Sequence, residues 1–365
     1  MNEKLILKCN NTRDSIKDTN TGKNNHLVAT SSHPMKFIDL CSGIGGFHIG
    51  LKQHTCILAC DINKNCRESY KRNYNIDCKK DIFDLHANDI SDFHILCAGF
   101  PCQPFSSAGL KKGLDDNRSQ VYDKILELVT AKKPNLVFLE NVKNLLVMDD
   151  GNVIKKIIND FKSIGYNISY TILNTAHFGL AQNRERVFIV CVNKSVYGDK
   201  TFDFSNLKQI NITKSLKDVI DTNNNTYIEE DKYVLLDTDK IKTQKSGIVF
   251  CGYLKGNLRK NGTLPNTDHL SRVHKQPYRI YHINGVNPTL SSSEVSGRYH
   301  IYDGMGVRKL TVRECFGLMG FPSTYTLHEK SNINLSQIGN AVSPIIIEYI
   351  HDELTKQGFI QNLSV

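Results

Sequence analysis

The chain has 365 residues, with 46 Lys or Arg and 37 Asp or Glu, so its formal net charge is +9; 40% of its residues are hydrophobic. This length suits two domains or one large domain with an insertion, and no apolar run approaches the roughly 18 residues of a membrane-spanning helix. The 11 cysteines show no repeated spacing, which is typical of free thiols in a cytoplasmic protein and argues against a disulfide framework.

Residues 1–34 are polar, rich in Asn, Lys, Thr and Ser, and lack the apolar core of a secretory signal, so we expect a disordered extension. Cys56, Cys60 and Cys66 lie close in sequence to His54, and all four are zinc-ligand types. Two of these cysteines fall inside an apolar, strand-like run, so no metal site is predicted.

Apolar strands and amphipathic helices alternate over the first half of the chain. Short apolar runs predict strands, and apolar residues on one helical face predict helices that end at Pro134 and Gly165. The expected strands cover residues 37–40, 56–59, 92–100 and 135–141, and the expected helices cover 118–132 and 153–164. Residues 169–175 and 186–192 are expected to close the sheet as an antiparallel pair. The pattern predicts an α/β fold: a mostly parallel, Rossmann-like sheet with helices on both faces.

The pattern changes after residue 193. Residues 201–247 are polar and rich in Asn, and residues 251–306 contain short strand-like pieces with many Gly, Ser and Asn. Lys and Arg outnumber Asp and Glu from 251 to 313, which fits contact with nucleic acid but also fits a solvated basic surface. Helical signals return with a capping box at Thr311 and Glu314, and with Ser343 and Pro344 at the start of a final helix that stops at Gly358.

The segment "FIDLCSGIGGFHIG" joins a predicted strand to a glycine-rich turn and a predicted helix. Gly43 and Gly45 let the backbone turn tightly and approach a ligand at the carboxyl end of the first strand. Asp61 follows the second strand, where a carboxylate accepts hydrogen bonds from ribose hydroxyls, and Asp81 is placed to meet an adenine amino group. Each acid also fits a helix cap, and the glycine spacing is not that of a dinucleotide site.

Three further groups follow predicted strands or precede one. In "GFPCQPFSSAG" a thiol, Cys102, stands between two prolines after an apolar strand, and Glu140 follows the next strand. In a parallel sheet both would point into one crevice, as a candidate nucleophile and a candidate proton donor. Arg184 and Arg186 share a face of an extended segment and suit a carbonyl oxygen or a phosphate, or form a surface pair.

The motifs "DLCSGIGGF", "GFPCQPFS", "LENV", "QNRER", "RKLTVREC" and "QIGNAVSP" occur in an order that resembles cytosine-5 DNA methyltransferases, over residues 35–350. The resemblance implies that Cys102 attacks carbon 6 of cytosine, Glu140 contacts ring nitrogen 3 and Arg186 holds the ring carbonyl. It also implies that Arg184 and Ser106 support the cysteine. The methyl donor would be S-adenosylmethionine, and the target base would be flipped out of the duplex.

The resemblance also implies a cofactor site. Phe47 would pack against the adenine, Asp61 would hold the ribose, Asp81 would face the adenine amino group, and Asn340 would return to the pocket from the C-terminal side. The family often has an aromatic residue where this chain has Cys41 and Ile62, which puts some adenine packing in doubt. The full expected cofactor set is Asp39, Gly43, Gly45, Phe47, Asp61, Ile62, Asp81, Ile82, Pro101 and Asn340.

The resemblance divides the rest of the chain. We expect a catalytic domain at 35–195, a smaller loop- and strand-rich target-recognition domain at 196–322, and a C-terminal segment at 323–365 that returns to the catalytic domain. "NPTLSSS" resembles the Thr-Leu signature of the recognition region. Basic side chains there should mostly contact phosphates, with Arg279 and Arg298 the first candidates for reading bases. The expected DNA-contacting residues are Gln182, Arg259, Lys260, Arg272, Lys275, Arg279, Thr289 and Arg298.

The favoured interpretation is the modification enzyme of a bacterial restriction-modification system, because the chain is short and lacks regulatory domains. We expect a cytoplasmic monomer that acts on duplex DNA, with a separately encoded restriction endonuclease as its counterpart and no membrane contact. A tRNA cytosine-5 methyltransferase would share the same catalytic residues. A nicotinamide-dependent oxidoreductase would leave Cys102, Glu140 and Arg186 unexplained, and a silent DNA-binding homologue would not need Cys102 and Glu140.

Overall fold

The computed structural model describes residues 34–101, 118–255, 266–292 and 299–360. Every described residue belongs to one compact unit, Ser32–Val365. The expected extension, Cys102, Ser106, Arg259, Lys260 and Arg298 therefore lie outside the described residues.

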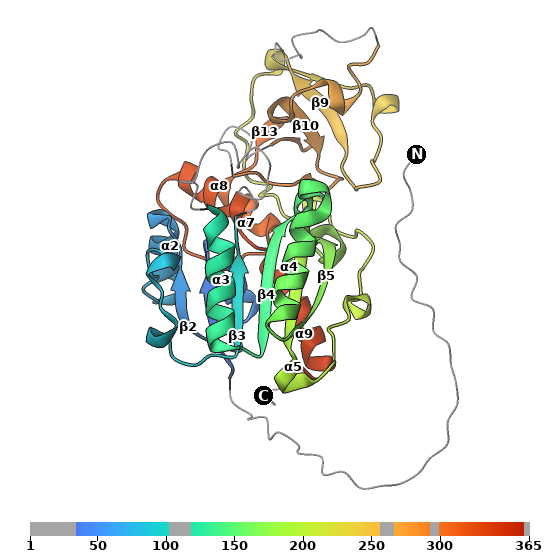
Figure 1. Cartoon of the computed structure of the whole chain (residues 1–365). Helices are drawn as coiled ribbons and strands as arrows, with labels where there is room; N and C mark the ends of the chain where they lie inside the picture. The colour runs from blue at the N-terminus through green and yellow to red at the C-terminus, as the bar shows by residue number, and fades with distance from the viewer. Residues whose placement is uncertain (1–33, 102–117, 256–265, 293–298, 361–365) are drawn as a thin grey trace, which may run out of the picture. The chain divides into compact units, whose positions relative to one another are not determined.

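A six-stranded sheet forms the centre of the described unit, in the order β2-β1-β3-β4-β7-β5 (Figure 1). Neighbours from β2 to β4 pair in parallel, whereas β7 is antiparallel to both β4 and β5. This confirms the mostly parallel sheet and its antiparallel closing pair. The strands are β1 (Lys36–Leu40), β2 (Thr55–Cys60), β3 (Ile95–Gly99), β4 (Leu136–Val142), β5 (Tyr166–Asn174) and β7 (Glu185–Asn193).

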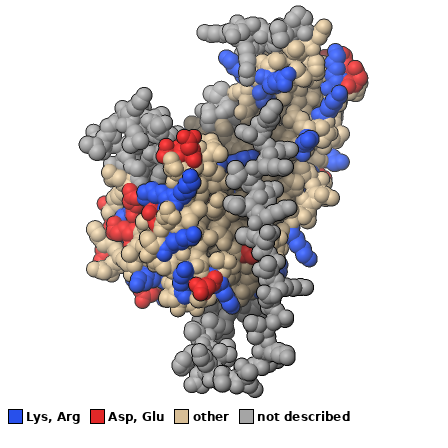
Figure 2. All heavy atoms as spheres, turned by 45° about the vertical axis from the view of Figure 1, so that its right-hand side comes forward, with Lys and Arg blue, Asp and Glu red and all other residues tan. Residues whose placement is uncertain are grey.

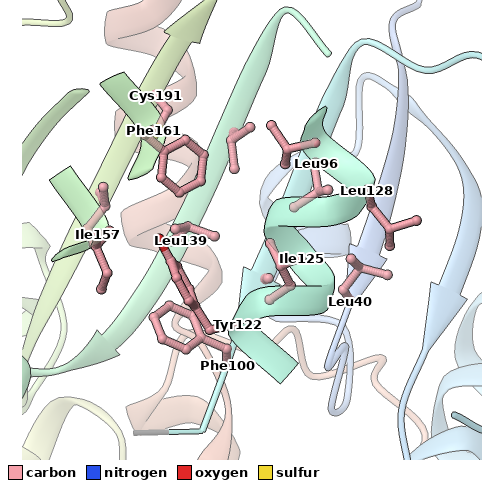
Figure 3. Packing of buried hydrophobic residues seen from close by; sticks show 14 of the residues in the cluster. Leu40, Leu96, Phe100, Tyr122, Ile125, Leu128, Leu139, Ile157, Phe161 and Cys191 are labelled. Carbon is pink, nitrogen blue, oxygen red and sulfur yellow. The ribbon is translucent and has the colours of Figure 1, made fainter. Parts of the chain in front are cut away.

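Helices cover both faces of this sheet because successive strand residues point to opposite faces. On one face, Leu40, Leu96 and Leu139 pack against α3 (Arg118–Lys132) and α4 (Asn152–Ser163) (Figure 3). The alternate residues pack on the other face, where α1 (Gly46–Gly50) and α9 (Pro344–Lys356) supply the cover. The α/β class predicted from the sequence is confirmed.

The helix ends predicted from the sequence are observed, except that one predicted capping hydrogen bond is absent among the described residues. Thr311 and Glu314 form the expected capping box at the start of α7 (Val312–Leu318). Gly165 follows α4 with φ of 90°, as a helix-ending glycine should. Ser343 and Pro344 begin α9, but the Ser343 hydroxyl donates to the Met319 carbonyl and does not cap the helix.

A second, five-stranded sheet lies within the segment after residue 230, in the order β13-β12-β10-β9-β8. Strands β10 and β12 pair in parallel and the other neighbours are antiparallel. The strands are β8 (Tyr233–Leu235), β9 (Phe250–Leu254), β10 (Arg279–His282), β12 (His300–Tyr302) and β13 (Val307–Lys309). The predicted domain boundaries remain a prediction.

Two short strands, β6 (Gln182–Asn183) and β11 (Asn287–Pro288), pair in parallel across more than 100 positions of sequence. They join the start of β7 to the segment that carries the second sheet. The remaining helices are α2 (Lys64–Tyr74), α5 (Lys194–Tyr197) and α8 (Ser331–Asn340). Within the described ranges, none of the helices has the length and apolar character needed to span a membrane.

Candidate active site

The predicted functional residues gather at one edge of the central sheet. The carboxyl ends of β1, β2, β3 and β4 meet there because these strands run in parallel. Strand β7 runs the other way, so its first residues reach the same edge, and Arg186 pairs with Val142 at the end of β4. The same edge of the sheet therefore carries the candidate residues of the site: the glycine loop, Asp61, the end of β3, Glu140 and Arg186.

The glycine loop is held by the end of β2. The Gly43 amide donates to Asp61 Oδ2 at 2.8 Å, and the Asn63 amide donates to Asp61 Oδ1 at 2.8 Å. Gly43 and Gly45 have φ angles of 53° and 83°, where glycine is favoured over residues with a Cβ. An added Cβ at Gly43 would meet no described atom within 4 Å, so the loop backbone borders open space there.

Asp39 lies beneath this loop and is completely buried. Its Oδ2 accepts a hydrogen bond from the Tyr70 hydroxyl at 3.3 Å, and Oδ1 has no hydrogen-bond partner among the described residues. Burial raises the pKa of the Asp39 carboxyl well above its ordinary value, against the hydrogen bond from Tyr70. This geometry favours a supporting position over direct contact with a ligand.

The other expected cofactor residues differ in exposure. The Ile62 side chain, next to Asp61 in the sequence, is 67% exposed. Phe47 is 2% exposed in the core between the sheet and α9, whereas Ile82 is buried in the core on the face covered by α3 and α4. Asp81 caps a short 3-10 turn by accepting from the Phe83 amide at 3.1 Å. Asp81 therefore acts as a helix cap, the alternative role considered for it, and uses one carboxylate oxygen to do so.

The C-terminal part of the chain returns to this edge. An added Cβ at Gly46 would collide with the Val342 carbonyl oxygen, so α1 and the turn before α9 touch backbone to backbone. Asn340 ends α8 just before this turn and is exposed. Asn340 thus lies two residues before the backbone that touches Gly46, and its contact with the cofactor stays a prediction.

Buried Glu140 forms an ion pair with half-buried Arg186. Arg186 Nε lies 3.3 Å from Glu140 Oε1, and the residue Glu140 is 8% exposed. Burial raises the pKa of the Glu140 carboxyl, while the guanidinium groups of Arg186 and Arg184 act in the opposite direction. A raised pKa favours the protonated carboxyl, which can donate a hydrogen bond or a proton.

The strand that precedes Cys102 in the sequence ends at the same edge of the sheet. Gly99, the last residue of β3, is the register partner of Glu140, and Pro101 is half-buried. The Asn141 side chain donates to the Phe100 carbonyl at 2.9 Å. This bond ties the end of β4 to the residues that follow β3, and a polar residue directly after the candidate acid is the feature of the sequence that signals it.

Gln182 and Arg184 do not face the surface. Gln182 is completely buried; its amide nitrogen donates to the Leu318 carbonyl, and its amide oxygen accepts from the Leu290 amide. This argues against the expected DNA contact of Gln182. Arg184 is 2% exposed and donates to backbone carbonyl oxygens. These bonds use its guanidinium to hold backbone segments near the site, which suits a supporting role and not contact with a substrate.

The expected DNA-contacting residues after β7 divide into two groups. Arg272 and Lys275 are exposed, as a phosphate contact requires. Arg279 turns its Nε and one terminal nitrogen to the His274 carbonyl, at 3.1 and 2.9 Å, and the Thr289 hydroxyl donates to the Asn183 carbonyl. These internal bonds reduce what Arg279 and Thr289 can offer a base, although neither is fully buried.

Comparison with protein families gives one match across most of the chain. The model for the C-5 cytosine-specific DNA methylase family matches residues 35–356. Type II methyltransferase M.HhaI of Haemophilus parahaemolyticus is 31% identical, over 87% of this chain and 93% of its own length. Type II methyltransferase M.Bsp6I of Bacillus sp. (strain RFL6) is 32% identical, over 88% of this chain and 99% of its own length.

Solved structures resemble the fold. The Dnmt2 methyltransferase of S. pombe superposes with a TM-score of 0.61 at 19% identity, over 88% of this chain and 99% of that chain. A putative DNA modification methyltransferase encoded within a prophage of E. coli gives a TM-score of 0.60 at 23% identity, with the same two coverages. At these identities the structural likeness bears on the fold alone.

Proposed function

The chain belongs to the C-5 cytosine-specific DNA methylase family, and from this we propose that it methylates cytosine within a short, specific duplex sequence through a covalent adduct of Cys102. It is a DNA (cytosine-5-)-methyltransferase of the kind found in type II restriction-modification systems. The observation that carries the proposed mechanism is the ion pair of buried Glu140 with Arg186, because Glu140 is the register partner of Gly99 at the end of the strand that leads to Cys102.

In the proposed reaction the Cys102 thiolate forms a C–S bond to carbon 6 of the ring. Glu140, in its protonated form, donates a hydrogen bond to ring nitrogen 3, and Arg186 binds the ring carbonyl oxygen. Electron density displaced from the ring double bond makes carbon 5 nucleophilic. Loss of the carbon 5 proton to solvent after methyl transfer restores the double bond and releases the thiolate.

The residues at the glycine loop fit S-adenosylmethionine, which supplies the methyl group when bound. Each Asp61 carboxylate oxygen accepts one backbone hydrogen bond and keeps a further lone pair for a ribose hydroxyl. The exposed Ile62 side chain offers an apolar surface for an adenine face, and the space beside Gly43 lets a ligand approach the backbone. We propose Asp61, Ile62, the loop backbone and Asn340 as the cofactor contacts.

We propose that duplex DNA is bound with the target base flipped out, because the reacting carbons are inaccessible inside a base stack. Exposed Arg272 and Lys275 support this binding as phosphate contacts. Figure 2 shows Lys and Arg side chains over the visible face, with Asp and Glu side chains among them in both its upper and its lower part. A cognate restriction endonuclease that cleaves the unmethylated site is part of the proposal.

The decisive experiment is bisulfite sequencing of DNA from a host that expresses the chain. We expect protected cytosines at one short sequence in every copy of that sequence. Purified protein should also transfer labelled methyl groups to duplex DNA and not to tRNA. Transfer to tRNA and not to DNA would contradict the proposed DNA substrate and favour a tRNA cytosine-5 methyltransferase.

Replacement of the nucleophile separates chemistry from binding. Cys102→Ser should abolish methylation, because a hydroxyl is a far weaker nucleophile at neutral pH, and should leave cofactor affinity unchanged. Duplex DNA with 5-fluorocytosine at the target should form a stable adduct with the unaltered chain and none with Cys102→Ser, because fluorine does not leave as a proton does. Turnover of Cys102→Ser near the original rate would contradict the covalent mechanism.

A further inference from the structure

Arg184 joins three segments that are far apart in the sequence. One terminal nitrogen donates to the Leu290 and Gly339 carbonyls, both at 3.2 Å, and the other donates to Gly339 at 3.2 Å and Ala341 at 2.8 Å. Leu290 follows the Thr-Leu signature of the expected recognition region. Gly339 and Ala341 flank Asn340, which we propose as a cofactor contact.

The two segments held by Arg184 also touch each other directly. An added Cβ at Gly339 would collide with the backbone of Ser291 and Ser292. Gln182 adds a second link, because its amide accepts from the Leu290 amide at 2.9 Å and donates to the Leu318 carbonyl at 3.0 Å. Neither segment can shift without altering the hydrogen bonds of the other.

The use of a charged residue here requires a reason. Burial lowers the pKa of the Arg184 guanidinium to about 9, so the group stays protonated at neutral pH despite the cost of removing it from water. Its hydrogen-bond acceptors among the described residues are neutral carbonyls, and its Nε has no partner among them. A rigid, planar donor that reaches several acceptors at once is the property that arginine has and an apolar residue or lysine lacks.

From these contacts we infer that Arg184 is a positioning residue that couples DNA binding to cofactor binding. DNA that contacts the Thr289–Leu290 segment and cofactor that contacts Asn340 both favour the arrangement in which the three carbonyls converge on the guanidinium. Each ligand then raises the affinity for the other by the same factor, as linkage requires. The inference rests on the proposed function, since it needs both ligands.

The test measures the affinity for target duplex DNA with and without saturating S-adenosylhomocysteine. In the unaltered chain we expect the cofactor product to tighten DNA binding by about 5- to 150-fold, the usual range for coupled sites. Arg184→Lys keeps the charge but cannot reach the three carbonyls, so this factor should fall to nearly one while each ligand alone still binds. The reciprocal measurement, cofactor affinity with and without DNA, should change equally.

A matched control separates coupling from stability. Arg308 is also buried, but it pairs with Glu314 at 2.8 Å and contacts none of the Arg184 partners. Arg308→Lys should lower the thermal midpoint and preserve the coupling factor. If Arg184→Lys fails to fold, Gln182→Met serves in its place, because it removes the second link to Leu290 without a change of charge, and the factor should fall there too.

Two results would overturn the inference. One is a coupling factor in Arg184→Lys, or in Gln182→Met, equal to that of the unaltered chain. The other is an unaltered chain that binds both ligands with a coupling factor of one. An unaltered chain that binds neither ligand would instead contradict the proposed function, so the two failures are distinguishable.

Discussion

At the scale of single residues, the protonation state of Glu140 is set by two opposing influences. Burial favours the neutral acid, and the neighbouring Arg186 guanidinium favours the carboxylate. The net effect is a pKa above the ordinary value of a glutamate. The proposed hydrogen bond to ring nitrogen 3 requires the neutral acid, so activity should depend on this balance.

Replacement of Glu140 by Gln tests that dependence. A glutamine keeps a neutral donor, but its N–H is far less acidic than a carboxylic acid and stabilises the charge that develops on ring nitrogen 3 less well, so Glu140→Gln should slow single-turnover methyl transfer by about 10²- to 10³-fold. Because the acid of the unaltered chain is lost as pH rises through its raised pKa, the rate ratio of the unaltered chain to Glu140→Gln should fall with rising pH. Titration of Cys102 affects both proteins and cancels in the ratio.

Rates are measured across the neutral range under saturating DNA and cofactor. A ratio that stays constant with pH would show that the protonation of Glu140 does not limit the reaction. A ratio that rises with pH would assign Glu140 the role of a base.

Some residue roles could be predicted from the sequence and others could not. Glu140 and Asp61 follow predicted parallel strands and Arg186 begins a predicted antiparallel one, so their meeting at one sheet edge follows from these pairings. Gln182 was expected to contact DNA, but its side chain is completely buried. Its partners Leu290 and Leu318 are more than 100 positions away, and no local pattern reveals that a polar side chain is satisfied by such distant backbone groups.

At the scale of elements, apolar patterning gave the central sheet because its strands are buried on both faces. The predicted strand 37–40 is observed as Lys36–Leu40, and 135–141 as Leu136–Val142. Apolar patterning predicted short strand-like pieces after residue 250 but not how they pair in the second sheet. Its strands are three to five residues long, and parallel pairing of β10 with β12 depends on contacts that no short period encodes.

The C-terminal helix α9 is held to the body by a pair of histidines. The Met35 amide donates to His54 Nδ1 at 3.2 Å, which leaves the proton of that ring on Nε2, and Nε2 lies 3.0 Å from Nε2 of His351. Asp352 lies beside the other nitrogen of His351 at 3.3 Å. One proton between the two rings satisfies both, whereas a charged His54 would lose the bond to Met35.

Stability should therefore fall in mild acid. Burial lowers the pKa of His54 to about 4, with His351 and His94 adding to the effect, and burial also lowers the pKa of His351 against Asp352 and Glu348. The unfolded chain takes up protons near pH 6.5, before the folded chain does. The stabilisation is complete above that pH and declines toward about pH 4, by at most about 1.4 kcal/mol per pH unit for each proton.

The free energy of unfolding, measured in denaturant at several pH values, checks this expectation. His54→Gln should flatten the decline between about pH 6.5 and 4.5. His86→Gln, which alters an exposed histidine, should not. Equal slopes for the unaltered chain and His54→Gln would remove the histidine pair as the cause.

At the scale of the whole molecule, the segment expected to recognise DNA is joined to the sheet edge by more than a covalent link. Strands β6 and β11 pair, the Thr289 hydroxyl donates to Asn183, and Leu290 is bonded to both Gln182 and Arg184. Residues 287–290 are thus hydrogen-bonded to the site, although they lie inside the expected recognition domain, residues 196–322, and inside its part 196–307 to which we assign specificity. This places a constraint on any exchange of that range.

Exchange of residues 196–307 for the matching segment of M.Bsp6I tests where specificity resides. We expect the hybrid to methylate the sequence of the donor enzyme, as mapped by bisulfite sequencing, because the exposed basic residues lie in the exchanged segment. A second hybrid that keeps Asn287, Pro288, Thr289 and Leu290 of this chain should be faster by about tenfold, since each retained hydrogen bond is worth about 0.5–1.5 kcal/mol. A hybrid that is active yet keeps the original target would place recognition in the α/β body, and equal rates for the two hybrids would deny residues 287–290 their role in joining the segment to the site.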